Sequence, residues 1–338
     1  MDKLLTISIA AYNVEKYIGQ TLDSVLNNKI CSESLKSRLE VLVINDGSTD
    51  QTATVAEHFA GKFPDIVRII NKENGGYGSV INTGIQEAEG KYFKPLDGDD
   101  WLDGEGLSYV LEYLENGDAD IVITDFTKCY ANGKSIRECI NTAGMSEGKK
   151  YVFDEKIDNV PWISYHAIIF KTGILKENDI HIDENCFYTD TELKIYAVPF
   201  IRTMVYLKCN LYCYRLGMEQ QSVSRKGRTM HILDEKKVAD SLLEKYRDEM
   251  GELPSATKSY IARAIGGHCV WHYRSLLLCR PEKSNKEEII AFDRQIRNVS
   301  AEIYGYMESI SVLVWLMRKT NYKLYKLICF LRRHKRER

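Results

Sequence analysis

The stretch that decides the fold reads YFKPLDGDDW and spans residues 92–101. Its mostly apolar first half is expected to form a buried strand, and the carboxylates of Asp97, Asp99 and Asp100 follow directly. Carboxylates so close together at a strand end repel one another and lose solvation. They persist most easily where a divalent cation or a polyol binds between them. A diphosphate carried by such a cation is the natural ligand of this acidic motif.

Three other structures could explain the same acidic motif. A calcium-binding EF-hand loop is excluded, because its fifth position needs an oxygen ligand and its sixth a glycine, where this chain has Trp101 and Leu102. A solvated acidic turn stays open on the triplet alone, since short acidic motifs often arise by chance. A phosphatase that forms a phosphoaspartate also uses Asp-X-Asp after a strand, with the first Asp as nucleophile. Trp101 counts against that class, which has Thr or Val at this position.

The first hundred residues alternate between apolar strands and helical segments. Strands are expected over residues 4–11, 39–44, 67–70 and 92–96, and helices over residues 14–26, from 48 or 49 to about 61, and up to about 89. Either Ser48 or Thr49 can cap the second helix. This alternation predicts an α/β fold with a mostly parallel sheet and helices on both faces. Ligands of such sheets bind outside the carboxyl ends of the strands, where polar residues occur here.

Glycines follow the third expected strand at Gly75, Gly76 and Gly78. Their spacing is not the GxGxxG of dinucleotide-binding folds, and a GxxxxGK[ST] phosphate loop does not occur in the sequence. Close approach of the backbone to a ligand, or a simple helix start, explains these glycines better.

Taken in order, the motifs at the strand ends resemble those of the family 2 glycosyltransferases. They are Ala11-Tyr12-Asn13, Asn45-Asp46-Gly47-Ser48-Thr49-Asp50, Asn74-Gly75-Gly76, Asn82-Thr83-Gly84 and Leu96-Asp97-Gly98-Asp99-Asp100. The resemblance covers about residues 4–225. It implies the GT-A fold, a nucleotide-binding αβα sandwich, and transfer of sugar from a nucleotide-sugar donor with inversion at the anomeric carbon. We therefore expect a catalytic domain over residues 1–225 and a helical region over 226–338.

The resemblance also implies roles for individual residues. It assigns nucleotide-sugar binding to Tyr12, Asp46, Asn74, Gly76 and Asp97, and metal binding to Asp97 and Asp99. Tyr12 would flank the base, and Asp46 would accept a hydrogen bond from uracil, because a carboxylate only accepts. Asp99 would coordinate Mn²⁺ or Mg²⁺ bridging the two phosphates of a UDP-sugar, and this cation would stabilise the departing diphosphate.

A base is also needed to deprotonate the acceptor hydroxyl. Members of the family supply it from an Asp that follows an acidic residue, and Asp190 matches that position, with Thr189 where the acidic residue is expected. Glu192 is the alternative base. Asp190 could instead cap a helix that begins at Thr191. Trp162, Tyr165 and His166 are candidates for the acceptor side, although a lone His more often has a structural role.

Beyond the catalytic motifs the pattern becomes helical. Gln220–Arg225 resembles a flexible segment that closes over the diphosphate, with Arg225 or Lys226 supplying charge, and a solvated linker is the alternative. Helices are expected over residues 231–250, 255–279 and 286–307. The helical region is where acceptor specificity is expected to lie.

The end of the chain, residues 312–338, combines an apolar helical pattern with cations. Residues 318–338 hold nine Lys or Arg and one acid, so this tail carries about +8, whereas the formal net charge of the chain is −2. A basic amphipathic helix suits an anionic membrane surface, and a packed helix with a solvated basic end is the alternative. The apolar stretch is much shorter than the roughly 20 residues that cross a bilayer. Nucleic-acid binding is not expected, because the tail is accompanied by no recognised nucleic-acid module.

The cysteines predict a reducing environment. Nine cysteines are scattered without a Cys-X-X-Cys pair, and Cys209 with Cys213 lacks a second pair for zinc. Since Met1 leads almost directly into an expected core strand, a signal peptide is not expected. We expect a cytoplasmic protein, located peripherally on the inner face of the cell membrane.

Two hypotheses follow for function. One is a metal-dependent, inverting glycosyltransferase that moves sugar from a UDP-sugar to a glycan or lipid-linked glycan in cell-surface polysaccharide synthesis. The other is a catalytically silent GT-A domain that acts as a binding or assembly subunit. The presence of Asp97, Asp99 and Asp190 favours the enzyme, since a silent domain has no need for all three.

Overall fold

The computed structural model describes residues 2–28, 30–218 and 221–334. Within it the chain packs as two compact units, Met1–Gly217 and Met218–Arg338. The residues of the sequence-based expectations that lie outside the described part are Gln220, Lys335, Arg336, Glu337 and Arg338.

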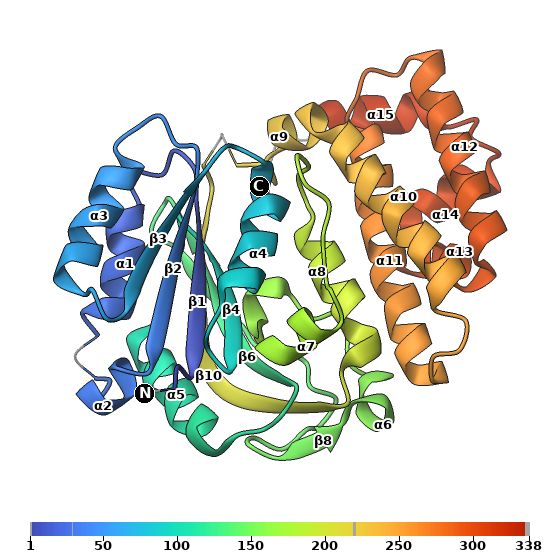
Figure 1. The fold of residues 1–338 in the computed structure, drawn as a ribbon. Coiled ribbons are helices and arrows are strands. Elements are labelled where there is room, and N and C mark those ends of the chain that lie inside the picture. The colour runs from blue at the N-terminus through green and yellow to red at the C-terminus, as the bar shows by residue number, and fades with distance from the viewer. Residues whose placement is uncertain (1, 29, 219–220, 335–338) are drawn as a thin grey trace. The chain divides into compact units, whose positions relative to one another are not determined.

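The first unit is built on a ten-stranded sheet (Figure 1). The order is β3-β2-β1-β4-β9-β6-β10-β5, with β7 paired to β6 and β8 to β10. Neighbours among β1 to β4 run parallel, as do β6 and β10, and the remaining pairs are antiparallel. The strands are β1 (Leu5–Ala11), β2 (Leu39–Asp46), β3 (Val67–Lys72), β4 (Tyr92–Asp97), β5 (Trp101–Leu102), β6 (Ile121–Tyr130), β7 (Ser135–Glu138), β8 (Lys150–Val152), β9 (Ile168–Lys171) and β10 (Thr203–Leu216).

Helices cover both faces of this sheet. Figure 1 shows α1 and α3 on one face and α4 and α7 on the other. β2 is buried along its whole length, as expected for a strand covered on both sides. The predicted α/β class with a mostly parallel sheet is thereby confirmed. The helices are α1 (Ile18–Leu26), α2 (Glu33–Lys36), α3 (Thr52–Lys62), α4 (Gly76–Glu87), α5 (Gly104–Asn116), α6 (Phe153–Ile157), α7 (Thr172–Glu177) and α8 (Asp190–Ala197), with 3₁₀ turns η1 (Tyr165–Ala167) and η2 (Val198–Phe200).

The register of the parallel strands brings their polar ends to one edge. Ala10 at the end of β1 lies opposite Asp97 of β4, and Asp46 of β2 lies opposite Lys72 of β3. The loops that follow these strands therefore start from the same edge, as in other open α/β sheets. Residues far apart in the sequence can act together there.

Two local expectations were wrong. Neither Ser48 nor Thr49 caps α3, because the helix begins at Thr52 and the Asp50 carboxylate accepts a hydrogen bond from the Thr52 N–H at 2.9 Å. The helix expected over residues 286–307 is interrupted at Ser300. The hydroxyl of Ser300 accepts from the Ile303 N–H and caps a new helix, a common role of serine.

The second unit is entirely helical in its described part. Its centre is a buried ion pair between Arg318 and Asp293, 2.6 Å apart, to which Tyr322 also donates a hydrogen bond. None of its helices, nor any other described helix, has the length and apolar character needed to span a bilayer. The helices are α9 (Arg225–Met230), α10 (Ile232–Glu249), α11 (Ser255–Leu276), α12 (Lys283–Val299), α13 (Ala301–Ile310), α14 (Val312–Lys319) and α15 (Tyr325–His334).

Candidate active site

The acidic motif forms the turn between β4 and β5. Asp100 is fully buried, and its two oxygens accept hydrogen bonds from the Tyr212 hydroxyl and the Arg215 N–H, both at 2.7 Å. Arg215 also donates from Nε to the carbonyl oxygen of Asp99. β10 thus holds the turn from two directions. Asp97 and Asp99 are less completely buried than Asp100.

The charges of this turn are unfavourable without a counter-ion. Burial, and next the negative charge of Asp99, raise the pKa of Asp97 to about 7. Burial raises the pKa of Asp99 as well, and that of Asp100 lies well above its usual range for the same reason and because of Asp97 and Asp99. A divalent cation would relieve this repulsion and return the carboxylates to their ionised forms.

A hydrogen-bonded chain of tyrosines connects Asp97 to α4. The Tyr165 hydroxyl donates to Asp97 Oδ1 at 3.1 Å, and the Tyr77 hydroxyl donates to Tyr165. The backbone N–H of Asp97 donates to Tyr212. Three aromatic side chains from different elements therefore fix the position of one carboxylate.

His166 lies beside these tyrosines and completes a cluster of possible metal ligands. Its ring stacks between Phe126 and Tyr214, at 5.3 and 4.2 Å between ring centroids. Burial, and next the charge of Lys94, hold the pKa of His166 well below its usual range, which leaves a neutral imidazole. Metals bind this form.

The ligand atoms of Asp97, Asp100 and His166 all lie within 4.8 Å of one another. Asp99, which the sequence names as a ligand, is not in this group, although it belongs to the same turn. Carboxylate oxygens and an imidazole nitrogen are suitable donors for Mn²⁺, and carboxylates alone suffice for Mg²⁺. The residues present therefore fit a divalent cation.

Asp46 lies at the neighbouring strand end and holds the glycine-rich loop. Its carboxylate accepts hydrogen bonds from Lys72 Nζ and from the N–H groups of Gly75 and Gly76, at 2.8, 3.0 and 2.9 Å. Oδ1 has two of these partners and Oδ2 has one, so Oδ2 can accept one further hydrogen bond. Asn74 donates its side-chain amide to the Asp46 carbonyl and closes the same loop.

Tyr12 lies exposed at the end of β1, where it can cover a planar ligand. Half of its surface, 51%, is accessible. The loop that carries it is fixed by Asn13, whose side chain accepts from the Thr49 N–H at 2.9 Å. Tyr12 and Asp46 follow the paired strands β1 and β2, so the structure brings these two predicted residues to the same edge.

The glycine run serves to dock another segment of the protein. A Cβ atom at Gly78 would lie 1.9 Å from the carbonyl oxygen of Asp183, so only glycine fits there. The Asn185 N–H donates to the Gly75 carbonyl at 2.7 Å, and Asn82 exchanges two hydrogen bonds with the backbone of Ile182. The start of α4 thereby positions the segment that leads to α8.

Asp190 is the first residue of α8, and its side chain is 35% exposed. It does not cap a helix beginning at Thr191, because α8 already includes it and Thr189 is the N-cap position. Lys194 lies 3.5 Å from its carboxylate and 4.5 Å above the ring of Trp162. The charge of Asp190 contributes to raising the pKa of Asp97, so the two carboxylates interact electrostatically.

Glu192 is poorly suited to act as a base. Its side chain is completely buried, and Oε2 accepts a hydrogen bond from the Asp183 N–H at 2.8 Å. The carboxylate therefore anchors the segment before α8. Of the two predicted bases, only Asp190 is open to an acceptor.

Sequence reasoning missed Lys94 and Lys194. Lys94 precedes the acidic motif on β4, is fully buried, and donates Nζ to the carbonyls of His166 and Ile168 at 2.7 and 3.1 Å. It thus joins β4 to the turn that carries Tyr165. A lysine inside an otherwise apolar strand is the signal that could have revealed it.

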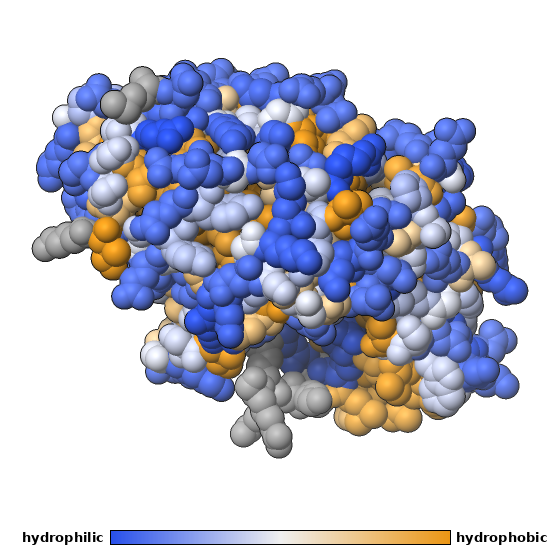
Figure 2. Space-filling model, turned by 90° about the horizontal axis from the view of Figure 1, so that it is seen from below, coloured by the Kyte–Doolittle hydropathy of each residue, from blue (hydrophilic) through white to orange (hydrophobic). Residues whose placement is uncertain are grey.

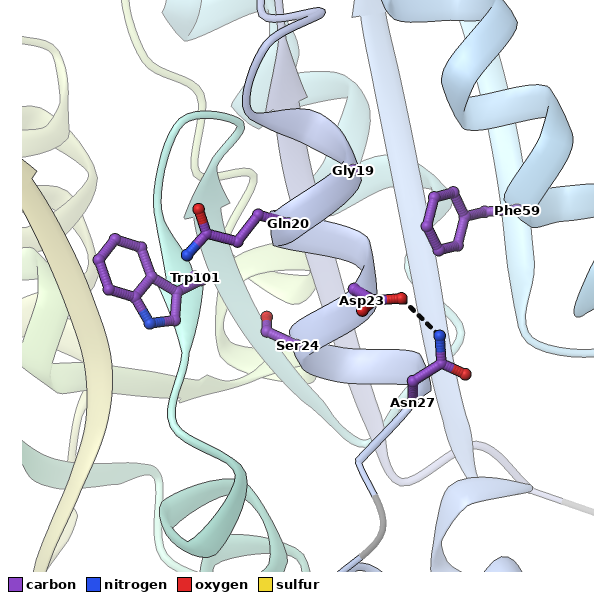
Figure 3. Close-up of a pocket in the computed structure, with 7 residues that line it drawn as sticks. All are labelled: Gly19, Gln20, Asp23, Ser24, Asn27, Phe59 and Trp101. Atoms are coloured by element: carbon purple, nitrogen blue, oxygen red, sulfur yellow. Dashed lines mark hydrogen bonds between the residues drawn. The ribbon is translucent and has the colours of Figure 1, made fainter.

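A separate open groove lies over α1 and has a volume of about 570 Å³ (Figure 3). Figure 3 shows Trp101 and Phe59 on either side of this helix, whose polar side chains lie between them. None of the predicted site residues lines the groove. The candidate active site is the strand-end cluster and not this groove.

Comparisons with known proteins agree with this geometry. The family model described as glycosyl transferase family 2 matches residues 6–179, which is more than half of the chain. Hyaluronan synthase of Pasteurella multocida is 35% identical over 255 residues, covering 69% of this chain and 24% of the synthase. The chain therefore spans about a quarter of that relative.

Solved structures share the fold. S. aureus TarS in complex with UDP-GlcNAc superposes with a TM-score of 0.68 at 18% identity, covering 99% of this chain and 93% of TarS. The mannosyltransferase PcManGT from Pyrobaculum calidifontis, in complex with GDP-Man and Mn²⁺, superposes with a TM-score of 0.56 at 14% identity. The match covers 98% of this chain and 87% of PcManGT. With the family model matched and the strand-end motifs assembled on one edge, the chain belongs to glycosyl transferase family 2 and has the fold of its GT-A members.

Proposed function

We propose that the protein transfers a sugar from a UDP-sugar to a hydroxyl group of a glycan or lipid-linked glycan. The observation that carries this proposal is that Tyr12, Asp46 and Asp97 lie at one edge of the sheet, with the charge of Asp190 acting on Asp97. The exposed ring of Tyr12 suits a planar base, and Asp46 Oδ2 retains one acceptor position for an N–H of uracil. The complex of TarS with UDP-GlcNAc supports the choice of donor.

The acidic turn would hold Mn²⁺ or Mg²⁺ together with the diphosphate of the donor. Asp97 and Asp99 are the proposed ligands, and Asp100 with His166 lies close enough to contribute or to orient them. A bound cation supplies Lewis-acid stabilisation of the departing diphosphate. The Mn²⁺ in the PcManGT complex supports this assignment.

Asp190 would act as the general base. Its carboxylate removes the proton from the acceptor hydroxyl as that oxygen bonds to the anomeric carbon, while the bond from that carbon to the diphosphate oxygen breaks on the opposite side. UDP leaves, and the anomeric configuration inverts. Lys194 lies 3.5 Å from the carboxylate and helps to hold it in position.

The acceptor would belong to cell-surface polysaccharide synthesis, as the relation to hyaluronan synthase supports. We place the reaction in the cytoplasm, as the scattered cysteines of the sequence, without a Cys-X-X-Cys pair, predict. The helical unit would contribute to acceptor choice. The loops of the strand edge do not by themselves define the sugar or the linkage.

The end of the helical unit would contact an anionic membrane surface. Leu327, Phe330 and Leu331 of α15 are more than half exposed, and the cations Lys323 and Lys326 lie on or next to the same helix. Such an exposed apolar face beside cations suits the headgroup region of a bilayer. Figure 2 shows another view of the molecule, in which hydrophilic side chains predominate and apolar ones gather at the lower right.

This membrane contact is tested by co-sedimentation with vesicles that contain phosphatidylglycerol. A Leu327→Gln variant should bind them more weakly than the parent protein, because an exposed apolar anchor is lost. Equal binding of the two proteins would contradict the contact.

Transfer itself is tested with a panel of UDP-sugars, Mn²⁺ and acceptors from a cell extract, with release of UDP as the readout. Asp190→Asn should lower kcat by about 100-fold to 10,000-fold and leave UDP affinity unchanged, since only the proton acceptor is lost. Asp99→Asn should weaken Mn²⁺-dependent donor binding. The matched control is Asp179→Asn, an exposed site where the backbone φ of 47° suits Asn. Full turnover by Asp190→Asn, or donor binding without turnover in the parent protein, would contradict the proposal.

A further inference from the structure

Three arginines of the helical unit come together from three helices. Arg225 is the first residue of α9, Arg274 lies in the last turn of α11, and Arg332 lies in α15. Arg225 donates from Nη2 to the carbonyl oxygen of Arg332 at 2.8 Å, which joins α9 to α15. Burial, and next the charges of Arg274 and Arg225, lower the pKa of Arg332, so these positive charges act on its guanidinium group.

Two other arginines of the helical unit are paired with acids. Arg318 forms an ion pair with Asp293 at 2.6 Å, and Arg228, three residues after Arg225, lies 3.8 Å from buried Glu235. Among the described residues, by contrast, Arg274 and Arg332 have no carboxylate within ion-pair distance. Holding Arg274 and Arg332 without such partners is unfavourable unless an anion binds.

One donor in this cluster is also unsatisfied. Nε of Arg332 is buried and has no hydrogen-bond partner among the described residues. A buried N–H without a partner is uncommon and costs free energy, so its presence calls for a missing acceptor. Guanidinium groups bind phosphate oxygens well because they offer parallel N–H donors in a plane.

We propose that Arg225, Arg274 and Arg332 form a binding site for a phosphate group. The site lies within the helical unit and goes beyond the proposed transfer reaction, on which it does not depend. The phosphate could belong to a soluble, phosphate-bearing acceptor or to the headgroup of an anionic lipid. Both sources present the same oxygens to the arginines.

The test uses the full-length protein and inorganic phosphate, with chloride at equal ionic strength to account for screening. Thermal unfolding is followed over a phosphate titration for the parent protein, Arg274→Gln and Arg332→Gln. Phosphate should raise the Tm of the parent protein more than chloride does, and each variant should need at least about tenfold more phosphate for the same rise. Without phosphate, Arg274→Gln should melt no lower than the parent, because a repulsive charge is removed.

The matched control is Arg280→Gln, which removes an exposed arginine near the end of the same helix. It should keep the full phosphate response. An equal response of the parent protein to phosphate and chloride, or an equal loss of response in Arg280→Gln, would overturn the site. If Arg332→Gln does not fold, the phosphate response of Arg274→Gln alone tests the site.

A second measurement identifies the source of the phosphate. Vesicles of phosphatidylcholine, with and without phosphatidylglycerol, are sedimented with the parent protein and Arg274→Gln. If the parent protein sediments with the anionic vesicles and Arg274→Gln does so more weakly, the phosphate belongs to a lipid headgroup. A phosphate response without vesicle binding supports a soluble phosphorylated ligand.

Discussion

At the scale of single residues, the carboxylates of the site have different tasks that their surroundings define. Asp100 is buried with both oxygens hydrogen-bonded, and Glu192 is buried with Oε2 bonded to the Asp183 N–H, so both hold the backbone in place. Asp46 accepts hydrogen bonds from the backbone of the glycine-rich loop, and its Oδ2 can accept one more. Asp190 remains partly exposed beside a lysine. Burial and hydrogen bonding therefore separate structural acids from those available for chemistry.

Asp50 provides a residue-scale prediction about stability. Its carboxylate accepts from the N–H groups of Thr52 and Glu15, and these hydrogen bonds lower its pKa although partial burial opposes them. Asp50→Ala should therefore reduce the free energy of unfolding by about 1 kcal/mol at neutral pH, because the hydrogen bonds to this carboxylate are lost. Urea unfolding measures this value, with Thr49→Ala as the control of small effect.

The pH dependence of the Asp50 contribution has a definite sign. Because the pKa of Asp50 is lower in the folded protein than in the unfolded chain, its stabilisation is present above the unfolded pKa and is lost as the pH falls through the folded one. The difference between the parent protein and Asp50→Ala should shrink in acid. A difference that grows in acid would contradict this role.

At the scale of elements, the start of α4 is a docking surface for the segment before α8. Gly78→Ala would force a methyl group against the Asp183 carbonyl, so α4 and this segment must separate. We expect loss of stability together with a fall in kcat, because Asp190 follows the displaced segment. Gly61→Ala is the matched control, since its Cβ would meet nothing within 4 Å, and it should raise stability by up to about 1 kcal/mol. Unaltered kcat in Gly78→Ala would contradict the coupling.

Element order could be predicted from the sequence because apolar strands and helical spacing alternate clearly up to the acidic motif. The strand order beyond β4 could not be predicted from the sequence, since the paired strands there are far apart in the chain. For example, β9 lies between β4 and β6. Asp97 and Asp99 were recognisable from local spacing. Lys94 and Lys194 were missed. The position of Lys94 inside an apolar strand marks it as unusual, but its contact with Ile168, and that of Lys194 with Trp162, join segments that are far apart in the sequence.

At the scale of the whole molecule, each unit has its own polar centre. In the helical unit, Arg318→Met would leave Asp293 buried and uncompensated, which typically costs about 3–5 kcal/mol. Hydrogen exchange should report faster opening of α12 and α14. The matched control is Lys319→Met at the next, exposed position, which should have little effect. Similar exchange in both variants would show that the ion pair does not hold this unit together.

The central claim is that the strand-end carboxylates surround a cation-held diphosphate, with Asp190 facing it. The most direct measurement is a crystal structure of the protein grown with UDP and Mn²⁺, with anomalous scattering recorded for manganese. The account predicts one manganese peak bonded to Asp97 or Asp99 and to the diphosphate, and the base of UDP between Tyr12 and Asp46. A UDP molecule bound with its diphosphate away from residues 97–100 would contradict the account.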